Sequence, residues 1–257
     1  MDSPYPIASK RQTNISLLGL PIHEVDRDGV HEFIQGVIES KQKALVLNLN
    51  VNCANLARKR LWLRDFLRTS QLTFCDGDGI RWGLRCLGYR PPPKITYDRW
   101  IWELAEFCEK RSLSLYFLGA KPGVAEKAAE QLQKRFPKLQ IAGTQHGYFE
   151  KKGAVNDKVI AEINRVSPDI LVLGFGMPLQ EQWLRDHWIS IKAHIFLTGG
   201  AVFDYASGLA KRAPHWMIQC HLEWLYRLSE EPGRLFVRYV FGIPYFFFCV
   251  FMEKLGR

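Results

Sequence analysis

Thr73-Phe74-Cys75-Asp76-Gly77-Asp78-Gly79-Ile80 is the stretch of sequence that best indicates how this chain folds. An apolar strand ends at Asp76, and two glycines follow within three residues. Glycine allows positive φ angles and a close approach of the backbone to a ligand. A carboxylate at such a turn would lie at the carboxyl edge of a sheet, where open α/β folds place their ligands. On this stretch alone, the alternative that Asp76 or Asp78 caps a helix beginning near Ile80 is the stronger one.

The segments around this stretch alternate between strand and helix patterns. Short runs rich in Val, Ile, Leu or Phe and bounded by Gly, Asn or Asp predict buried strands at 44–49, 113–118, 169–173 and 194–198, with 72–75 as a shorter fifth candidate. Helical patterns occupy 52–67, 98–108 (with Asp98 as its cap) and 123–136. Strands that alternate with helices predict an α/β fold, a Rossmann-like parallel sheet with helices on both faces.

The sequence changes character near Phe203. We expect residues 1–205 to form the α/β core and residues 206–257 to form a basic, aromatic, helical C-terminal appendage. The uncharged aromatic run 239–252 is shorter than the roughly 18–20 residues of a spanning helix, and Gly242 and Pro244 interrupt it. Two interpretations of this run stay open: it lies on an anionic membrane surface, or it packs against the core or a second subunit.

The composition limits the class of protein. With 257 residues, 47% of them hydrophobic, the chain fits one large domain, or one domain with an appendage. The net charge of +9 predicts an anionic partner, but scattered basic residues without a recognition motif argue against nucleic acid. Six cysteines without a C-x-x-C pair argue against disulfides or structural zinc and favour a reducing compartment. No signal peptide is visible, so we expect a cytoplasmic protein.

Polar or glycine residues follow each predicted strand. Asn48 and Asn50 close the first strand on the same side, and Asp76 closes the next. Gln180 follows the strand at 169–173, and the last strand runs into Gly199-Gly200. Glycine turns that lead into helices expose backbone N–H groups and the positive end of the helix dipole, which suits phosphate. Several such turns on one sheet edge favour a nucleotide-type site.

Other chemistries find less support in the sequence. The motifs G-x-x-x-x-G-K-[ST], G-x-G-x-x-G and G-x-S-x-G are missing, which argues against a P-loop ATPase, a nicotinamide enzyme and a serine hydrolase. His146 has no partner at metal-ligand spacing, so a structural role is favoured. Asp76 and Asp78 could together hold Mg²⁺ or Mn²⁺, although the glycine turn does not force them to one side. The basic residues Arg81, Arg85, Arg90 and Lys94 form either a solvated face or a phosphate site.

A set of motifs occurs in order along most of the chain. D-G-x-G-[IV] is matched at 76–80, G-x-P-x-Q-E-x-W at 176–183, G-x-x-F-D at 200–204, K-R-A-P at 211–214 and E-W-L-Y-R-L at 223–228. Together they resemble the WecG/TagA/CpsF family of bacterial glycosyltransferases (glycosyltransferase family 26). The chain departs from the family pattern at Asn48, where Thr is usual, and at Lys94, where Arg is usual. Lys cannot make the bidentate fork of Arg.

The resemblance implies transfer of a sugar from a UDP-sugar to a polyprenyl-diphosphate-linked acceptor, with inversion. It implies no essential metal and no cofactor beyond the donor, and a role in bacterial cell-surface polysaccharide synthesis. The enzyme would be peripheral on the inner face of the cell membrane, and homo-oligomer formation stays open. The alternatives are a soluble nucleotide-dependent oxidoreductase or methyltransferase, which would bind NAD or S-adenosylmethionine, and a non-catalytic membrane scaffold.

The resemblance also assigns roles to particular residues. Asp76 would be the general base, and Arg and Lys residues would stabilise the departing UDP. The assigned substrate-binding residues are Asn48, Asn50, Lys94, Gln180, Gly147, Tyr148 and Asp204, and those for acceptor or phosphate are Lys211, Arg212, Arg227 and Arg234.

Overall fold

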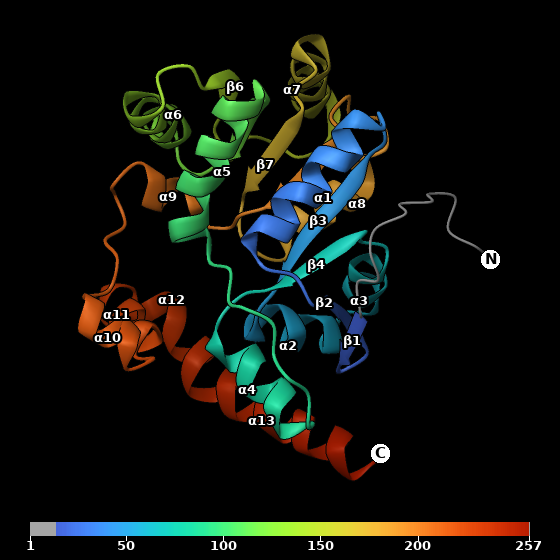
Figure 1. Ribbon diagram of the computed structural model, residues 1–257, viewed down its shortest axis with the longest axis vertical. Coiled ribbons are helices and arrows are strands. Elements are labelled where there is room, and N and C mark those ends of the chain that lie inside the picture. Colours follow the sequence, from blue (N-terminus) through green and yellow to red (C-terminus); the bar gives the residue numbers. More distant parts are fainter. Residues whose placement is uncertain (1–13, 257) are drawn as a thin grey trace, which may run out of the picture.

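The computed structural model describes residues 14–256 (Figure 1). Its strands are β1 (Asn14–Leu17), β2 (Leu20–His23), β3 (Ala44–Leu49), β4 (Leu72–Cys75), β5 (Ser114–Gly119), β6 (Gln140–Gln145), β7 (Ile170–Gly174) and β8 (Ile195–Thr198). Its helices are α1 (Arg27–Glu39), α2 (Val51–Lys59), α3 (Leu61–Arg68), α4 (Asp78–Cys86), α5 (Tyr97–Arg111), α6 (Val124–Arg135), α7 (Gly153–Val166), α8 (Leu179–His187), α9 (Val202–Ala206), α10 (His215–Gln219), α11 (Glu223–Glu230), α12 (Pro232–Phe236), the π-helical η1 (Val237–Phe241) and α13 (Gly242–Leu255).

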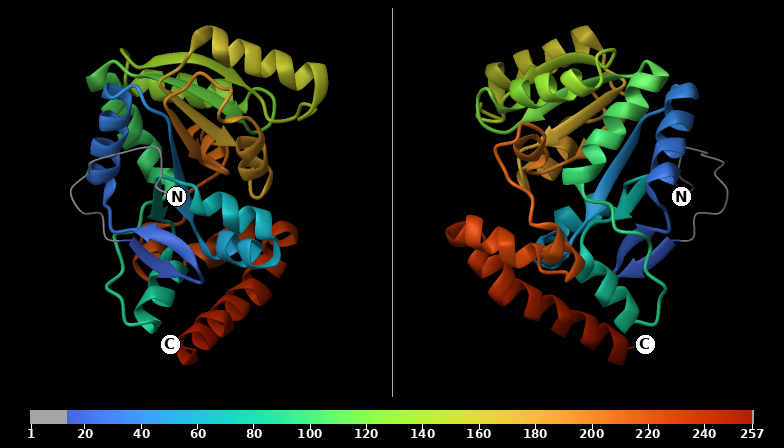
Figure 2. Two further views of the ribbon diagram at one scale, coloured as in Figure 1. Left: turned by 90° about the vertical axis from the view of Figure 1, so that its right-hand side faces the viewer. Right: turned by 60° about the vertical axis from the view of Figure 1, so that its left-hand side comes forward.

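Strands β3 to β8 form one sheet in the order β4-β3-β8-β7-β5-β6, and every pairing in it is parallel. Alternate residues of each strand enter different hydrophobic cores, because successive strand side chains point to opposite faces. In β3, Ala44 and Val46 pack with α1, α5, α6 and α9, whereas Leu45 and Leu47 pack with α2, α3, α7 and α8. The two helix layers are visible in Figure 2. The predicted α/β fold with helices on both faces is confirmed.

The expected strands all appear, with shifts of about one residue. The predicted helix 52–67 is wrong as a single element, because it is broken at Arg60, whose backbone is extended (φ −132°, ψ 98°). If α2 continued as one helix beyond Ala57, the next residues on its buried side would be at about 60, 61 and 64. The buried residues of α3 are instead Leu63, Phe66 and Leu67, and the break provides that change of register.

Two further differences concern helix starts and missed strands. The cap of α5 is Thr96, so Asp98 lies inside the helix and the prediction that it caps the helix is wrong. The edge strand β6 was not predicted, because its residues are at least partly exposed and its sequence is largely polar. The antiparallel hairpin β1–β2, which packs beneath the α2–α3 face of the sheet, was also missed.

The C-terminal helices gather on the side of the sheet toward which the parallel strands run (Figure 1). Residues 207–214 connect α9 to α10 without helix or strand structure. Helix α13 packs tightly on α4: a Cβ atom built on Gly83 would come within 2.8 Å of the Phe246 ring. Within residues 14–256, no helix combines the length and the apolar character that crossing a membrane requires.

Candidate active site

Asp76 directly follows β4 at the carboxyl edge of the sheet. Its backbone N–H donates a hydrogen bond to the Leu49 carbonyl at the end of the neighbouring β3 (2.9 Å). Gly77 then takes a positive φ of 94°, which a residue with a side chain rarely adopts, and α4 begins at Asp78. No side chain caps α4, so the capping alternative for Asp76 and Asp78 is wrong. The turn instead leaves the Asp76 carboxylate available for other contacts.

Two asparagine amides hold the Asp76 carboxylate. Asn48 Nδ2 donates to Asp76 Oδ2 at 2.8 Å, and Asn50 Nδ2 donates to the same oxygen at 3.1 Å. Asn50 is fixed by capping α2, since its Oδ1 accepts the N–H of Cys53. Asn48 is fixed by Thr198 at the end of β8, whose hydroxyl donates to Asn48 Oδ1 at 3.1 Å. Three adjacent strands thus bring these side chains together.

The surroundings of Asp76 shift its proton affinity. Burial raises the pKa of Asp76, while hydrogen bonds from Asn50 and Asn48 and the charges of Arg227 and Arg238 lower it, and the net shift is upward. A carboxylate with a raised pKa is a stronger base, which suits removal of a proton from a hydroxyl. Within the described part of the chain, both hydrogen bonds to this carboxylate reach Oδ2, leaving Oδ1 as the oxygen that can accept a proton.

The C-terminal helices bring positive charge toward Asp76. Arg227 lies in α11, with its guanidinium 5.9 Å from the centre of the Tyr205 ring. Burial lowers the pKa of Arg227, but Tyr239, Tyr205 and the Asp76 and Glu223 carboxylates outweigh it and raise that pKa overall. Arg238 in η1 also lowers the pKa of Asp76 and was not among the predicted site residues. The Arg227 position predicted from sequence is therefore close enough to act on Asp76 electrostatically.

The remaining basic candidates are placed differently. Lys94 Nζ contacts Asp78 at 2.8 Å and Glu223 at 3.5 Å. Arg212 pairs with Asp98 at 2.5 Å, and Lys211 is exposed in the connecting segment. Arg234 belongs to α12, but its side chain lies outside the described residues. Of the predicted cations, only Arg227 is linked by a described interaction to Asp76.

Gln180 is fully buried and connects two glycine turns. Its Oε1 accepts the N–H of Gly176 at 3.2 Å and of Gly200 at 3.1 Å, and its Nε2 donates to Glu181 Oε1 at 2.8 Å. These contacts fix the backbone after β7 and before α9, so Gln180 shapes the sheet edge from within. Burial raises the pKa of Glu181 to about 7, and its Oε2 has no hydrogen-bond partner among the described residues.

The other predicted substrate residues lie farther along the same edge. Gly147 and Tyr148 follow β6, at the opposite end of the sheet from β4. Gly147 donates its N–H to the Ala120 carbonyl at 2.8 Å, and a Cβ there would approach the Gly119 Cα to 3.2 Å. Tyr148 is 68% exposed, and Asp204 lies in α9. The predicted site residues therefore extend along the carboxyl edge from β4 to β6.

The site is thus the edge of a parallel sheet that carries a carboxylate with a raised pKa, and the charges of two arginines from the C-terminal helices act on that carboxylate. The chain belongs to the glycosyl transferase WecG/TagA/CpsF family, whose profile matches residues 15–257. This match does not support the oxidoreductase, methyltransferase and scaffold alternatives.

Two similar proteins bear the same enzyme name. An N-acetylglucosaminyldiphosphoundecaprenol N-acetyl-beta-D-mannosaminyltransferase of Bacillus subtilis (strain 168) is 29% identical over 220 residues, which cover 86% of this chain and 84% of that enzyme. The enzyme of the same name from Staphylococcus aureus (strain MRSA252) is 24% identical over 219 residues, covering 85% and 82%.

Proposed function

We propose that this protein transfers a sugar from a UDP-sugar to a polyprenyl-diphosphate-linked acceptor, in the synthesis of a bacterial cell-surface polysaccharide. The observation that carries the proposal is the Asp76 carboxylate, which Asn48 and Asn50 hold through one oxygen at the sheet edge. The named relatives act on a diphosphoundecaprenol-linked sugar, and their similarity spans most of both chains. An N-acetylated hexosamine donor is therefore the first to test.

The proposed reaction is a single displacement. Asp76 Oδ1 takes the proton of the acceptor hydroxyl, whose oxygen forms a bond to the anomeric carbon of the donor. The bond from that carbon to UDP breaks on the opposite face, and UDP leaves with the electron pair, so the configuration inverts. Asn48 and Asn50 keep Oδ2 occupied and thereby hold Oδ1 in one orientation. A raised pKa lets Asp76 accept the proton more readily than an exposed aspartate would.

The departing diphosphate gains negative charge, which fixed cations can stabilise. Arg227 and Arg238 supply this charge on the side of Asp76 covered by the C-terminal helices. We propose that Gly147, Tyr148 and Asp204 bind the nucleotide farther along the edge, and that Lys211, Arg212 and Arg234 contact the acceptor diphosphate. The net charge of +9 favours both anionic substrates.

We also propose that the reaction needs no metal ion. The Asp78 oxygens, which could have joined Asp76 in a metal site, are contacted by Arg81, Lys94 and His221. These cationic and ring nitrogen groups oppose a second cation at that carboxylate. Dialysis against EDTA should leave the rate unchanged, and recovery of a lost rate on adding Mg²⁺ or Mn²⁺ would overturn this point.

The activity test uses a panel of UDP-sugars with a short-chain lipid-diphosphate N-acetylglucosamine acceptor. We expect one N-acetylhexosamine donor, UDP-N-acetylmannosamine first, to be transferred with release of UDP. Calorimetry with UDP, NAD and S-adenosylmethionine accompanies the assay, and we expect binding of UDP alone. Binding of NAD or S-adenosylmethionine without UDP, or no transfer from any donor, would contradict the proposal.

The C-terminal helices offer a surface for peripheral membrane binding. Helix α13 buries Phe246, Cys249 and Val250 against the protein, so its run of apolar residues serves partly for packing. The other side of η1 and α13, together with the last residue of α12, stays exposed, and we call it the aromatic face. Its residues are Phe236, Val237, Val240, Phe241, Phe248, Phe251, Met252 and Leu255, each at least 41% exposed.

Vesicle sedimentation tests this surface. Apolar side chains flanked by basic residues bind best to anionic interfaces. The wild-type protein should therefore sediment with phosphatidylglycerol vesicles more than with phosphatidylcholine vesicles. The double variant Phe248→Ser and Phe251→Ser should sediment less. The matched control Leu61→Ser changes a residue on α3 that is 63% exposed and should behave as wild type. Equal binding by the double variant and the wild type would contradict the proposed surface.

A further inference from the structure

Asp78, two residues after Asp76, lies at the centre of a cluster of charges. Its Oδ2 contacts Lys94 Nζ at 2.8 Å and His221 Nδ1 at 3.1 Å, and its Oδ1 contacts Arg81 Nη1 at 3.3 Å. The Asp78 side chain is only 12% exposed. Burial raises the pKa of Asp78, but hydrogen bonds from Lys94 and His221 outweigh burial, and that pKa is lowered. The cluster therefore stabilises the charged carboxylate.

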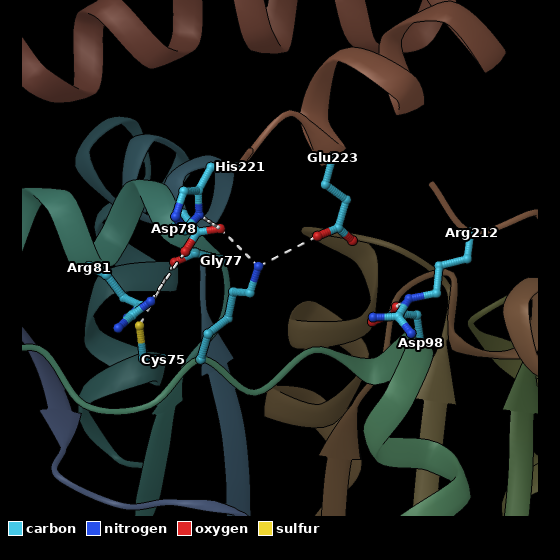
Figure 3. Close-up of polar contacts among 9 residues, drawn as sticks. Cys75, Gly77, Asp78, Arg81, Asp98, Arg212, His221 and Glu223 are labelled. Atoms are coloured by element: carbon cyan, nitrogen blue, oxygen red, sulfur yellow. Dashed lines mark hydrogen bonds and ion pairs between the residues drawn. The ribbon is translucent and has the colours of Figure 1, made fainter. Parts of the chain in front are cut away.

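Two members of this cluster come from the C-terminal segment. His221 follows α10 in a left-handed conformation (φ 58°), and Glu223 is the first residue of α11. Glu223 Oε2 lies 3.5 Å from Lys94 Nζ, so Lys94 is held between Asp78 of the core and Glu223 of α11. Figure 3 shows His221 and Glu223 reaching from the C-terminal segment toward the Asp78 turn. We call Asp78, Lys94, His221 and Glu223 the Asp78 cluster.

The apolar contacts around this part of the segment involve partly exposed side chains, such as Trp224 of α11, whose ring centre lies 6.1 Å from that of Tyr239 in η1. Helices α10 and α11 contain no buried residue. His221 does meet Trp82 of α4 edge-on, with the ring centres 5.9 Å apart, but Trp82 is itself 36% exposed. A helix without a buried apolar face needs polar contacts to keep a fixed position. The Asp78 cluster supplies such contacts at the start of α11.

Helix α11 also carries Arg227, whose charge acts on Asp76. From these observations we infer that Asp78 is a positioning residue, which fastens α11 to the sheet edge through Lys94, His221 and Glu223 and so holds Arg227 close to Asp76. Asp78 makes none of the helix-capping contacts that would otherwise explain an aspartate at the start of α4. It occupies the x position of the D-G-x-G motif.

The fastening itself is tested without substrate, by amide hydrogen exchange of the full-length protein. Asp78→Asn keeps the shape of the side chain and removes its charge. Exchange in residues 215–230 should become about tenfold faster, because a lost ionic contact raises the open population of a weakly packed segment. Exchange in β3 and β8 should not change. The matched control Asp65→Asn removes a carboxylate that pairs with Arg64 on α3 and should leave 215–230 unchanged.

A second variant leaves the turn at the start of α4 unchanged and so controls for any effect of Asp78→Asn on that turn. Glu223→Gln changes the C-terminal side of the cluster and should speed exchange in 215–230 in the same way. In the double variant with Asp78→Asn, the effects should be less than additive, because both residues hold the same helix. Unchanged exchange in both single variants, or fully additive effects, would overturn the inference.

The consequence for turnover rests on the proposed function and is measured separately. Asp78→Asn should lower kcat about tenfold with little change in KM for the UDP-sugar, because it displaces a group that stabilises the departing diphosphate. In an Arg227→Gln background, Asp78→Asn should cost almost nothing more, since it acts through Arg227. If Asp78→Asn lowered kcat in the Arg227→Gln background as much as it does in the wild type, Asp78 would not act through Arg227. If no UDP-sugar is transferred by the wild type, the proposed function fails, and the exchange experiment still decides the fastening.

Discussion

The sheet edge and the C-terminal helices hold their parts of the site in different ways. At the sheet edge, the neutral amides of Asn48, at the end of β3, and Asn50, just after it, fix Asp76. Over that edge, ionic and polar contacts between partly exposed side chains help to hold α11, which carries Arg227. Buried amide contacts are insensitive to salt, whereas exposed ion pairs are screened. The base is therefore built into the core, while the position of the cations can adjust.

Among the variants that compare the two regions, Asp76→Asn should have the largest effect, a loss of the transfer rate. The amide keeps an oxygen for Asn48 and Asn50 but cannot take a proton, so transfer should fall by roughly 10²–10⁴-fold. Thermal unfolding and UDP binding should stay close to wild type. Turnover at saturating acceptor is the measurement. Near wild-type turnover would show that Asp76 is not the general base. The strand ends would then not be the part of the molecule that holds the base.

Phe246→Ala should show where the C-terminal helices are joined to the core by packing. Phe246 is fully buried against Gly83 of α4, and removing a buried Phe side chain costs about 3–5 kcal/mol. Urea unfolding measures the loss. Phe248→Ala, on the same helix at 59% exposure, is the matched control and should change stability by less than about 0.5 kcal/mol. Equal losses in the two variants would mean that α13 does not anchor the segment.

Glu181→Gln should remove a pH dependence of stability that arises in the core. Because the pKa of Glu181 is raised to about 7 in the fold, the folded state holds its proton while the unfolded state releases it. Stability should therefore fall as pH rises from about 4.5 to 7 in the wild type, by up to about 3 kcal/mol. The variant should lose this decline and be the more stable protein at pH 8.

Urea unfolding at pH 5 and pH 8 tests this expectation. Glu130→Gln, an exposed position on α6, serves as the control and should follow the wild type at both pH values. A Glu181→Gln variant that is less stable than the wild type at pH 8 would contradict the raised pKa.

Arg227→Gln tests the C-terminal side and should have the smallest effect. Arg238 still lowers the pKa of Asp76 in this variant, so the rate should fall by up to about 10²-fold. The charge of Arg227 lowers the pKa of Asp76, so its removal should raise that pKa further. The acid limb of the kcat/KM profile should then move to higher pH. If the acid limb does not move, the charge of Arg227 does not act on the pKa of Asp76, and the two regions are not coupled in this way.

Much of the fold follows from the sequence alone. The buried strands β3, β4, β7 and β8 are short apolar runs, and such runs are the strongest signal of a parallel sheet. β6 was missed, because an edge strand with partly exposed residues lacks that signal. The break at Arg60 was missed for a different reason: residues 52–67 fit one helical period, and only packing on the sheet requires the change of register.

The candidate site was predictable where it depends on strand ends. Asn48, Asn50 and Asp76 close neighbouring strands, and parallel strands bring their carboxyl ends to one edge. Thr198 could have been found by the same rule, since it closes the next strand of the sheet. The roles of Asp78 and Lys94 depend on His221 and Glu223, which are far away in the sequence. No local pattern signals contacts over that distance.

The position of β8 also affects how the chain can fold while it is being made. β8 is the last strand in the sequence, yet it lies between β3 and β7 and pairs with both. Until residues 195–198 leave the ribosome, the sheet is in two parts. One part is β3 with β4, the other is β7 with β5 and β6, and no strand joins them. At about 5–20 residues per second, the roughly 150 residues between β3 and β8 take about 7–30 s to translate. During that time the nascent chain carries unpaired strand edges, which are prone to aggregate, so shielding by chaperones should matter most at this stage of synthesis.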